Sequence, residues 1–318
     1  MPIEVVDNVQ RSRHNWYGAK PWAKKVLARS AAHRAVRGAV RLAGSRLPRE
    51  RLPAPAALDR VTARMAGVSF VMLRPDRCII AKELYWGHGH RPRPADQLAL
   101  DVFAALVDEA RLVLDVGAYT GVFALLAAKR SRAAEVHGYE VVPAVAQAAR
   151  DNVAANGLQD RVAIHEAAIG AEGDSVVVDE GSGGSALPDF YSTRMSFSGG
   201  TKVQVRSLDA VVRELGVPPP AIVKIDVEGT EDVVLRHARA FLTSYRPDIL
   251  CEVLPGGNAP TVQAVLEPHG YRYLRVEDGA LRPHSEVTPR EHYRDWLFTT
   301  RGDAELASLG VPVVGRSA

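Results

Sequence analysis

The chain has 318 residues, of which 47% are hydrophobic and 24% charged, and its formal net charge is +3. These values are typical of a globular protein with one large α/β domain and an extension. No apolar run approaches the roughly 18 residues of a membrane span, and the N-terminus lacks the apolar core of a secretory signal. The composition therefore argues against a membrane-spanning or exported protein.

The two cysteines, Cys78 and Cys251, lie far apart in apolar runs. Such a pair is typical of buried thiols in a reducing compartment rather than of a disulfide. We therefore expect a cytoplasmic protein.

A basic arm covers residues 11–51, where basic side chains meet almost no acid before Glu50. Apolar residues recur there at helical spacing, so an amphipathic helix is expected that either packs on the main domain or lies peripherally on an anionic membrane surface or acidic partner. Packing is slightly favoured, because the apolar stripe is rich in alanine and has few large anchors. Since no nucleic-acid reading module accompanies the charge, no nucleic-acid partner is expected.

The chain is expected to divide into four parts, with Pro48, Pro53 and Pro55 marking the linker after the basic arm. Residues 1–60 are predicted to form the helical extension and its linker, residues 61–110 a lead-in hairpin and helix, residues 111–301 the main domain, and residues 302–318 a tail. Within the lead-in, the segment 68–73 is expected to pair with 78–81 around Pro75 and Asp76, and 95–107 has helical periodicity.

Aromatic residues and histidines gather in the glycine-punctuated loop 84–92, a composition that suits the wall of a pocket. His88 and His90 are candidates for binding a substrate or accepting a proton, because the ordinary pKa of histidine lies near neutrality. A surface loop explains the same residues equally well. No metal-ligand spacing surrounds them, and no metal is predicted.

The central pattern is an apolar run at 112–116 that contains Asp115 and leads through Gly117 and Gly121 into a helical segment. This order predicts a buried strand, a tight turn and a helix. A dinucleotide fingerprint would read G-x-G-x-x-G, but here Ala118 follows the first glycine and the pattern is D-x-G-x-x-x-G. A carboxylate would repel a pyrophosphate at the helix start and suits a cationic amino group such as that of S-adenosylmethionine. Asp115, Gly117, Ala118 and Gly121 are therefore candidate donor-binding residues.

Two further donor contacts are expected at the ends of the next two strands. Glu140 follows a strand-like run about 20 residues after the glycine turn, where an acid binds ribose hydroxyls. Glu166 and Ala167 lie in the segment 162–170, a third strand and its exit loop, near which an adenine ring could lie. The Gly/Ser-rich segment 180–200 is either a lid or plain disorder.

A second acidic strand end follows at 221–229, where Asp226 and Glu228 lie at the carboxyl edge at which open α/β sheets bind ligands. Because side chains alternate along an extended strand, these two acids are expected to face opposite ways, so that only one need point into the crevice. Glu231 and Asp232 fall in the first turn of the next helix, where acids are favoured without any function.

The motifs V-L-D-V-G-A at 113–118, K-I-D-V-E-G-T-E at 224–231 and I-L-C-E-V at 249–253 resemble the FkbM family of S-adenosylmethionine-dependent methyltransferases. The likeness covers roughly residues 65–301. It implies a class I methyltransferase fold, a Rossmann-like seven-stranded and mostly parallel sheet with helices on both faces and an antiparallel last strand. It also implies donor binding at Asp115, Gly117, Gly121 and Glu140, and a reacting centre near Asp226, Glu228 and Glu252.

The resemblance further implies O-methylation of a sugar, glycolipid or polyketide-type hydroxyl, as in natural product biosynthesis. Asp226 is then expected to act as base or to orient the acceptor, with Glu228 beside it and His88 or His90 as the rival base. A divalent cation at Asp226 and Glu252 stays an open alternative. Two other functions are considered: an NAD-type oxidoreductase on a similar sheet, which Asp115 disfavours, and a non-catalytic scaffold that uses the basic arm at a membrane.

Overall fold

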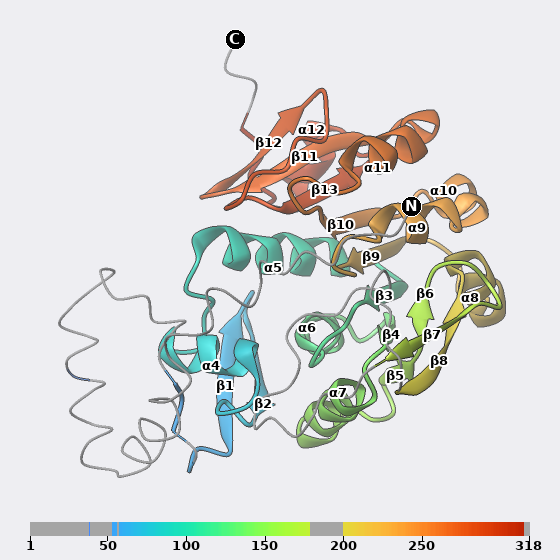
Figure 1. Cartoon of the computed structure of the whole chain (residues 1–318). Helices are drawn as coiled ribbons and strands as arrows, with labels where there is room; N and C mark the ends of the chain where they lie inside the picture. The colour runs from blue at the N-terminus through green and yellow to red at the C-terminus, as the bar shows by residue number, and fades with distance from the viewer. Residues whose placement is uncertain (1–37, 39–52, 56, 179–199, 315–318) are drawn as a thin grey trace.

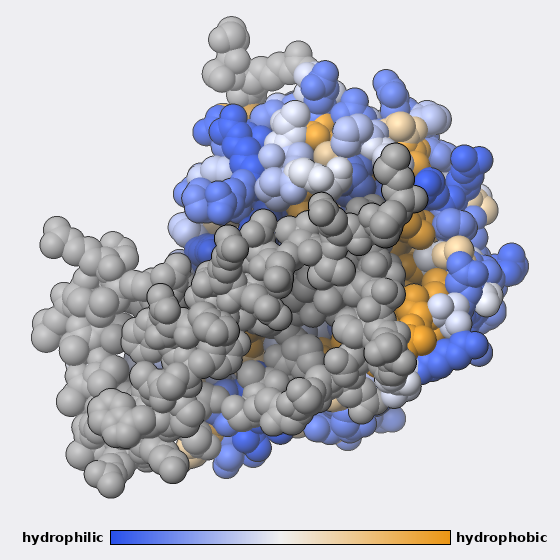
Figure 2. Space-filling model, in the orientation of Figure 1, coloured by the Kyte–Doolittle hydropathy of each residue, from blue (hydrophilic) through white to orange (hydrophobic). Residues whose placement is uncertain are grey.

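The computed structural model describes residues 38, 53–55, 57–178 and 200–314. Nearly all of the basic arm 11–51 and of the Gly/Ser-rich segment 180–200 lie outside the described residues, so the expectations for them stay predictions. No helix in the described ranges is long and apolar enough to cross a membrane. The described surface in Figure 2 is mainly hydrophilic, and Val177 and Val314 are the only large hydrophobic residues exposed within these ranges.

An eight-stranded sheet forms the centre of the molecule (Figure 1). Its strands, in chain order, are β3 (Leu112–Val116), β4 (Glu135–Glu140), β5 (Val162–Glu166), β9 (Ala221–Ile225), β10 (Asp248–Glu252), β11 (Arg272–Glu277), β12 (Ala280–His284) and β13 (Asp295–Thr299). They lie in the order β12-β11-β13-β10-β9-β3-β4-β5. The five strands from β10 to β5 run parallel, whereas β13 is antiparallel to both of its neighbours.

This topology confirms the expected mostly parallel class I sheet with its antiparallel last strand. The sheet has one strand more than the seven expected, because β12 adds an antiparallel edge to β11. Its Pro283 argues against a central strand, and an edge position tolerates it because the missing N–H need not pair with a further strand.

Helices cover both faces of the sheet. One face carries α5 (Pro94–Val107), α6 (Val122–Arg130) and α7 (Pro143–Ala155), and the other carries α8 (Leu208–Leu215), α9 (Glu231–Arg236), α10 (Arg239–Tyr245) and α11 (Ala259–Leu266). The 3-10 turn Glu267–His269 and helix α12 (Asp303–Ser308) complete the C-terminal part. Val113 packs into the core on the first face, and Leu112 and Leu114 into the core on the second. Strand β3 is therefore apolar except for Asp115, because both of its faces are buried.

The lead-in segment differs from the expectation. Strand β2 (Val68–Leu73) pairs with β1 (Arg60–Met65), not with 78–81, and residues Ile79–Trp86 form helix α4. The predicted pairing was wrong because Ile79 and Ile80 resemble a strand in composition, whereas the Cys78 side chain caps the helix by accepting a hydrogen bond from the Ala81 N–H.

Two asparagines, Asn152 in the last turns of α7 and Asn156 at its C-cap, fasten this hairpin to the main domain. The Asn156 side chain accepts a hydrogen bond from the Val71 N–H at 2.8 Å and donates one to the Val71 carbonyl at 2.7 Å. Asn152 accepts from the Leu73 N–H at 2.8 Å and donates to the Thr120 carbonyl at 2.9 Å. The hairpin is thereby tied to the turn between β3 and α6.

A small second sheet lies beside β5. Its strands are β6 (Ala168–Ile169), β7 (Ser175–Val178) and β8 (Thr201–Arg206), in the order β6-β8-β7. The alternating pattern of residues 203–207 is typical of an edge strand, but β8 is the central strand of the three. Its two partners have only two and four residues, so they are too short to show a periodic pattern.

Candidate functional site

A cavity of about 430 Å³ opens at the carboxyl ends of β3, β4, β9 and β10. The turns after β3 and β4 line one side of it, with Gly117, Ala118, Tyr139 and Glu140. Helix α4, the segment around Arg91 and the residues 291–295 line the opposite side. Its volume lies in the range of small-molecule sites, and its position is the one at which open α/β sheets bind ligands.

The turn after β3 is held by backbone hydrogen bonds to β4. The N–H groups of Gly117 and Ala118 both donate to the Tyr139 carbonyl at 2.9 Å. Tyr119, which occupies the place of a middle glycine, has a φ of +49° and donates its N–H to Glu140 Oε2 at 2.9 Å. A non-glycine residue in this left-handed region is strained and is characteristic of functional turns. Gly121 lies at the start of α6 and is not among the cavity-lining residues.

Asp115 does not lie in the cavity. Its side chain is buried beneath α6, only 1% of the residue is exposed, and Oδ2 accepts a hydrogen bond from the Ala124 N–H at 3.0 Å. Burial raises the pKa of Asp115 to about 7 against the opposing charge of Lys224. The expected direct contact between Asp115 and the amino group of a donor is therefore corrected: Asp115 binds the first turn of α6, where a helix presents unpaired N–H groups.

Glu140 lines the cavity and organises the two turns around it. Oε1 accepts a hydrogen bond from the Val142 N–H at 2.8 Å, and Oε2 accepts the one from Tyr119. Burial raises the pKa of Glu140 to about 7, although these hydrogen bonds oppose the shift. A carboxylate has about four lone-pair sites, so Glu140 can accept a further hydrogen bond from a ribose hydroxyl.

The two residues at the end of β5 that were predicted to contact the methyl donor, Glu166 and Ala167, lie in different places in the structure. Ala167 lines the main cavity, whereas Glu166 does not. Glu166 lines a second cavity of about 580 Å³ and forms an ion pair with Arg150 at 3.3 Å. The interpretation of Glu166 as a donor contact is therefore corrected, because the end of β5 directs that side chain away from the glycine turn.

Three carboxylates meet at the ends of β9 and β10. One oxygen from each of Asp226, Glu228 and Glu252 lies within 4.8 Å of the others, and all three residues line the cavity. The expectation that Asp226 and Glu228 face opposite ways was wrong. Strand β9 ends at Ile225, and Glu228 has a φ of +54°, so the chain turns back and brings both acids to the same side.

The three carboxyl groups differ in their pKa values. Burial raises the pKa of Asp226, but the charge of Lys224 and a hydrogen bond with Glu252 bring it below its usual range. Burial and the charge of Asp226 raise the pKa of Glu252 well above its usual range. Burial and the charges of Asp226 and Glu231 raise the pKa of Glu228 to about 8. At neutral pH, Asp226 is therefore the ionised member of the three.

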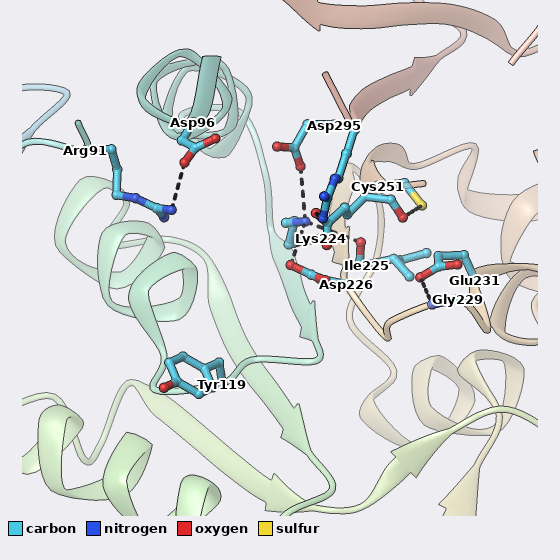
Figure 3. Close-up of polar contacts among 12 residues, drawn as sticks. Arg91, Asp96, Tyr119, Lys224, Ile225, Asp226, Gly229, Glu231, Cys251 and Asp295 are labelled. Carbon is cyan, nitrogen blue, oxygen red and sulfur yellow. Dashed lines mark hydrogen bonds and ion pairs between the residues drawn. The ribbon is translucent and has the colours of Figure 1, made fainter. Parts of the chain in front are cut away.

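Lys224 and Asp295 complete the polar floor of the cavity (Figure 3). Lys224 Nζ lies 3.5 Å from Asp226 Oδ2 and 3.5 Å from Asp295 Oδ1. The spacing of the three carboxylates alone would admit a divalent cation, but Lys224 already supplies positive charge at this point. We therefore assign no metal to the site.

The opposite wall is also charged and comes from the lead-in segment. Arg91 lies 3.0 Å from Glu83 through Nε and 3.0 Å from Asp96 through Nη2, and only 14% of its side chain is exposed. Figure 3 shows Arg91 and Asp96 across the site from Lys224 and Asp226. The Arg91 backbone N–H donates to the Gln97 side chain at 3.0 Å, which fixes the loop further.

Several of these residues were not singled out from the sequence. Lys224 carried a signal, because a lysine inside an apolar buried strand is rare unless paired. Tyr119 also carried a signal in the sequence, since it occupies the position of the middle glycine in a G-x-G-x-x-G turn. Arg91, Asp96 and Asp295 reach the cavity only through the packing of distant segments, and no local pattern marks them.

The histidine interpretation is not supported by the geometry. His88 and His90 are exposed in the turn after α4, and neither is among the cavity-lining residues. Gly87 and Gly89 explain the composition of this turn instead: a Cβ on Gly87 would lie 2.0 Å from the His90 carbonyl oxygen, and one on Gly89 would lie 2.9 Å from the Thr62 carbonyl oxygen. Gly89 lets the turn pack closely against β1, and Gly87 lets the turn close on itself.

A family model of the methyltransferase FkbM domain matches residues 115–273, which is half of the chain. The chain belongs to this FkbM methyltransferase family. The match includes the glycine turn, Glu140 and the three carboxylates, and it ends before Asp295. Curated proteins gave no match.

Solved structures of low sequence identity resemble this FkbM chain. Methyltransferase FkbM from Methylobacillus flagellatus is 14% identical, with 70% of this chain and 51% of that chain covered and a TM-score of 0.40. This chain thus spans about half the length of that relative. An O-methyltransferase from Bacillus cereus in complex with SAH is 14% identical, covers 64% of this chain and 78% of its own, and has a TM-score of 0.36.

FkbM methyltransferases use S-adenosylmethionine as methyl donor, and the residues present fit this group. Glu140 offers acceptor sites for ribose hydroxyls, and the backbone turn at Gly117 and Ala118 brings the chain close to the cavity without side-chain bulk. Val142 and Ile169 line the same cavity and provide apolar surface for a base.

Proposed function

We propose that this FkbM chain is an S-adenosylmethionine-dependent O-methyltransferase that acts on a hydroxyl group of a sugar, glycolipid or polyketide-type natural product. The observation that carries the proposal is the meeting of Asp226, Glu228 and Glu252 in the cavity that Glu140 also lines. A donor side and a proton-accepting side therefore share one cavity.

Asp226 is the best candidate for the group that contacts the acceptor. It is ionised at neutral pH, 35% of its side chain is exposed, and it lines the cavity. An ionised carboxylate accepts a hydrogen bond from a hydroxyl and can take its proton. Glu228 and Glu252 hold protons and can donate hydrogen bonds to neighbouring oxygens of the acceptor.

When bound, S-adenosylmethionine supplies a methyl group on a positively charged sulfur. The chain's contribution is to hold the acceptor oxygen in line with that methyl group at about 3 Å, because positioning is the main catalytic effect in such a displacement. As the acceptor oxygen becomes methylated its O–H bond breaks, and Asp226 accepts the proton. The walls suit an acceptor with several oxygens, because Arg91 and Asp96 offer a donor and an acceptor opposite Asp226.

Donor binding is tested by isothermal titration calorimetry with S-adenosylhomocysteine, and NADH serves as the competing ligand class. We expect S-adenosylhomocysteine to bind and NADH not to bind. The Glu140→Gln variant should bind S-adenosylhomocysteine about 10-fold or more weakly, since it loses the charged acceptor of ribose hydrogen bonds. Glu166→Gln is the matched control, because that carboxyl lies outside the main cavity. Binding of NADH alone, or equal effects of both variants, would contradict the proposal.

Methyl transfer is tested with isotopically labelled donor and a fractionated extract of the source cells. We expect label to appear in a hydroxylated small molecule or glycolipid as a methyl ether. Asp226→Asn should abolish labelling while binding of S-adenosylhomocysteine persists. Asp160→Asn, an exposed change outside the cavity, is the control. Labelling of nitrogen or carbon, or undiminished transfer by Asp226→Asn, would overturn the O-methyl assignment.

A further inference from the structure

A lysine is buried at the floor of the cavity, one residue before the end of β9. Only 3% of the Lys224 side chain is exposed. Nζ donates a hydrogen bond to the Ile225 carbonyl at 3.3 Å and lies 5.4 Å from the centre of the Phe123 ring. Burying an ammonium group is expensive unless opposite charges compensate it.

The compensation comes from two sides. Asp226 follows two residues later on the same segment, and Asp295 comes from the start of β13. Strand β13 runs antiparallel to β10, with Asp295 opposite Glu252 in register. The first residue of β13 therefore lies at the same edge of the sheet as the last residues of β9 and β10. Asp295 is outside the segment 115–273 that matches the family model.

We propose that Lys224, anchored by Asp295, is a positioning residue that holds the Asp226 carboxylate in the cavity as the hydrogen-bond acceptor for the acceptor hydroxyl. The inference rests on the proposed function, in which Asp226 contacts the acceptor. Asp295 and the Ile225 carbonyl fix the position of Lys224 Nζ. Its contact with Asp226 therefore holds the Asp226 carboxylate in one orientation.

The charges around Asp226 show why such a residue is needed. The groups that face it are mostly acids, and without Lys224 they would favour its protonated form. They are Glu228 on the same turn, Glu252 and Cys251 on β10, Asp295 on β13, Glu231 on α9, Asp115 on β3, and the two cations Lys224 and Arg91. Lys224 is itself fully charged, because Asp226, Asp295 and Glu252 raise its pKa although burial lowers it.

The consequence for the reaction is a division of roles among neighbouring carboxyls. With Lys224 present, Asp226 is the ionised member, and Glu252 is the protonated one that hydrogen-bonds to it. Without Lys224, the ionised form of Asp226 would lose its nearest compensating charge, and its preference over Glu252 for the ionised form would weaken. The acceptor hydroxyl would then face a carboxylate that is less firmly held as its hydrogen-bond acceptor.

The test is a carbon-13 NMR titration of the side-chain carboxyl groups in the full chain. The signal of Asp226 is identified by its absence in Asp226→Asn. In Lys224→Met, the titration midpoint of Asp226 should rise by about 1–3 pH units, the usual effect of removing an adjacent opposite charge. Lys224→Arg should restore most of the original midpoint. Lys202→Met, an exposed lysine outside the main cavity, is the control and should leave the midpoint unchanged.

A second variant covers the case in which Lys224→Met does not fold. Asp295→Asn removes a negative charge that repels the Asp226 carboxylate, so the midpoint of Asp226 should fall even though Lys224 loses part of its anchor. An unchanged midpoint of Asp226 in folded Lys224→Met, or an unchanged or raised one in Asp295→Asn, would overturn the inference. Binding of S-adenosylhomocysteine is measured on the same samples. Its absence from the wild-type chain would refute the proposed function, whereas its presence with an unmoved Asp226 midpoint would refute only the role of Lys224.

Discussion

Replacement of Gly117 by alanine tests how closely the donor turn and the reacting centre are packed. Gly117 has a φ of +77°, and a Cβ built there would lie 1.8 Å from the carbonyl oxygen of Asp226. Real Cβ contacts are essentially never shorter than 3.0 Å, so the two backbone segments would have to move apart by more than an ångström. This would also strain the hydrogen bond from the Asp226 N–H to the Val116 carbonyl at 2.9 Å.

Gly121→Ala is the matched control for this change. Gly121 has a φ of +83°, but a Cβ there would meet nothing closer than Ala149 Cβ at 3.6 Å. Both variants carry a left-handed strain of about 1–2 kcal/mol, and both lose the same unfolded-state entropy. Only Gly117→Ala adds an overpacking term of about 1–3 kcal/mol. We therefore expect a total destabilisation of about 2–5 kcal/mol for Gly117→Ala and about 1–2 kcal/mol for Gly121→Ala.

Urea unfolding followed by circular dichroism measures both losses, and calorimetry with S-adenosylhomocysteine measures the donor site. Gly117→Ala should also weaken donor binding and displace Asp226, whereas Gly121→Ala should leave binding nearly unchanged. Equal losses of stability in the two variants would show that the ends of β3 and β9 are not in the contact described here. The account of how the sequence brings the donor turn against Asp226 would then fail.

Four further outcomes follow from the structure. His88→Asn should leave donor binding and methyl transfer unchanged, and asparagine tolerates the left-handed backbone conformation at this position. A loss of methyl transfer with intact donor binding would instead support His88 as the base. Burial raises the pKa of Glu228 to about 8, so the contribution of this carboxyl to stability is full below about pH 4.5 and is lost as the pH rises through about 8. The free energy of unfolding, measured with denaturant between about pH 5 and about pH 9, should therefore decline less in Glu228→Gln than in the wild type. Asn152→Ala should cost about 1–3 kcal/mol in urea unfolding, because backbone groups of β2 and of the turn after β3 lose their partners. EDTA should leave methyl transfer unchanged, because Lys224 supplies the positive charge among the carboxylates, and restoration of a lost activity by a divalent cation would disprove this.

The strand, the glycine turn and the acid of the proposed donor side could be predicted from the sequence because their signals are local. The apolar run ending in Asp115 and Gly117 is a strand and turn for reasons of burial and backbone freedom that act within ten residues. Glu140 follows from the same repeat, one strand later. The role of Asp115 could not be predicted, because whether a carboxylate faces the cavity or the first turn of α6 depends on the side-chain direction at the strand end.

The sequence by itself determined the alternation of strands and helices, the class I sheet and the acids at the ends of its strands, because these depend on periodicity and on turn residues. Only the tertiary structure decided that Asp226, Glu228 and Glu252 converge, that Lys224 and Asp295 support them, and that Arg91 rather than His88 faces them. The physical reason is distance along the chain: Arg91 and Asp295 reach one cavity through the packing of α5 and β13 on the sheet, and such long-range contacts leave no periodic trace in the residues that make them.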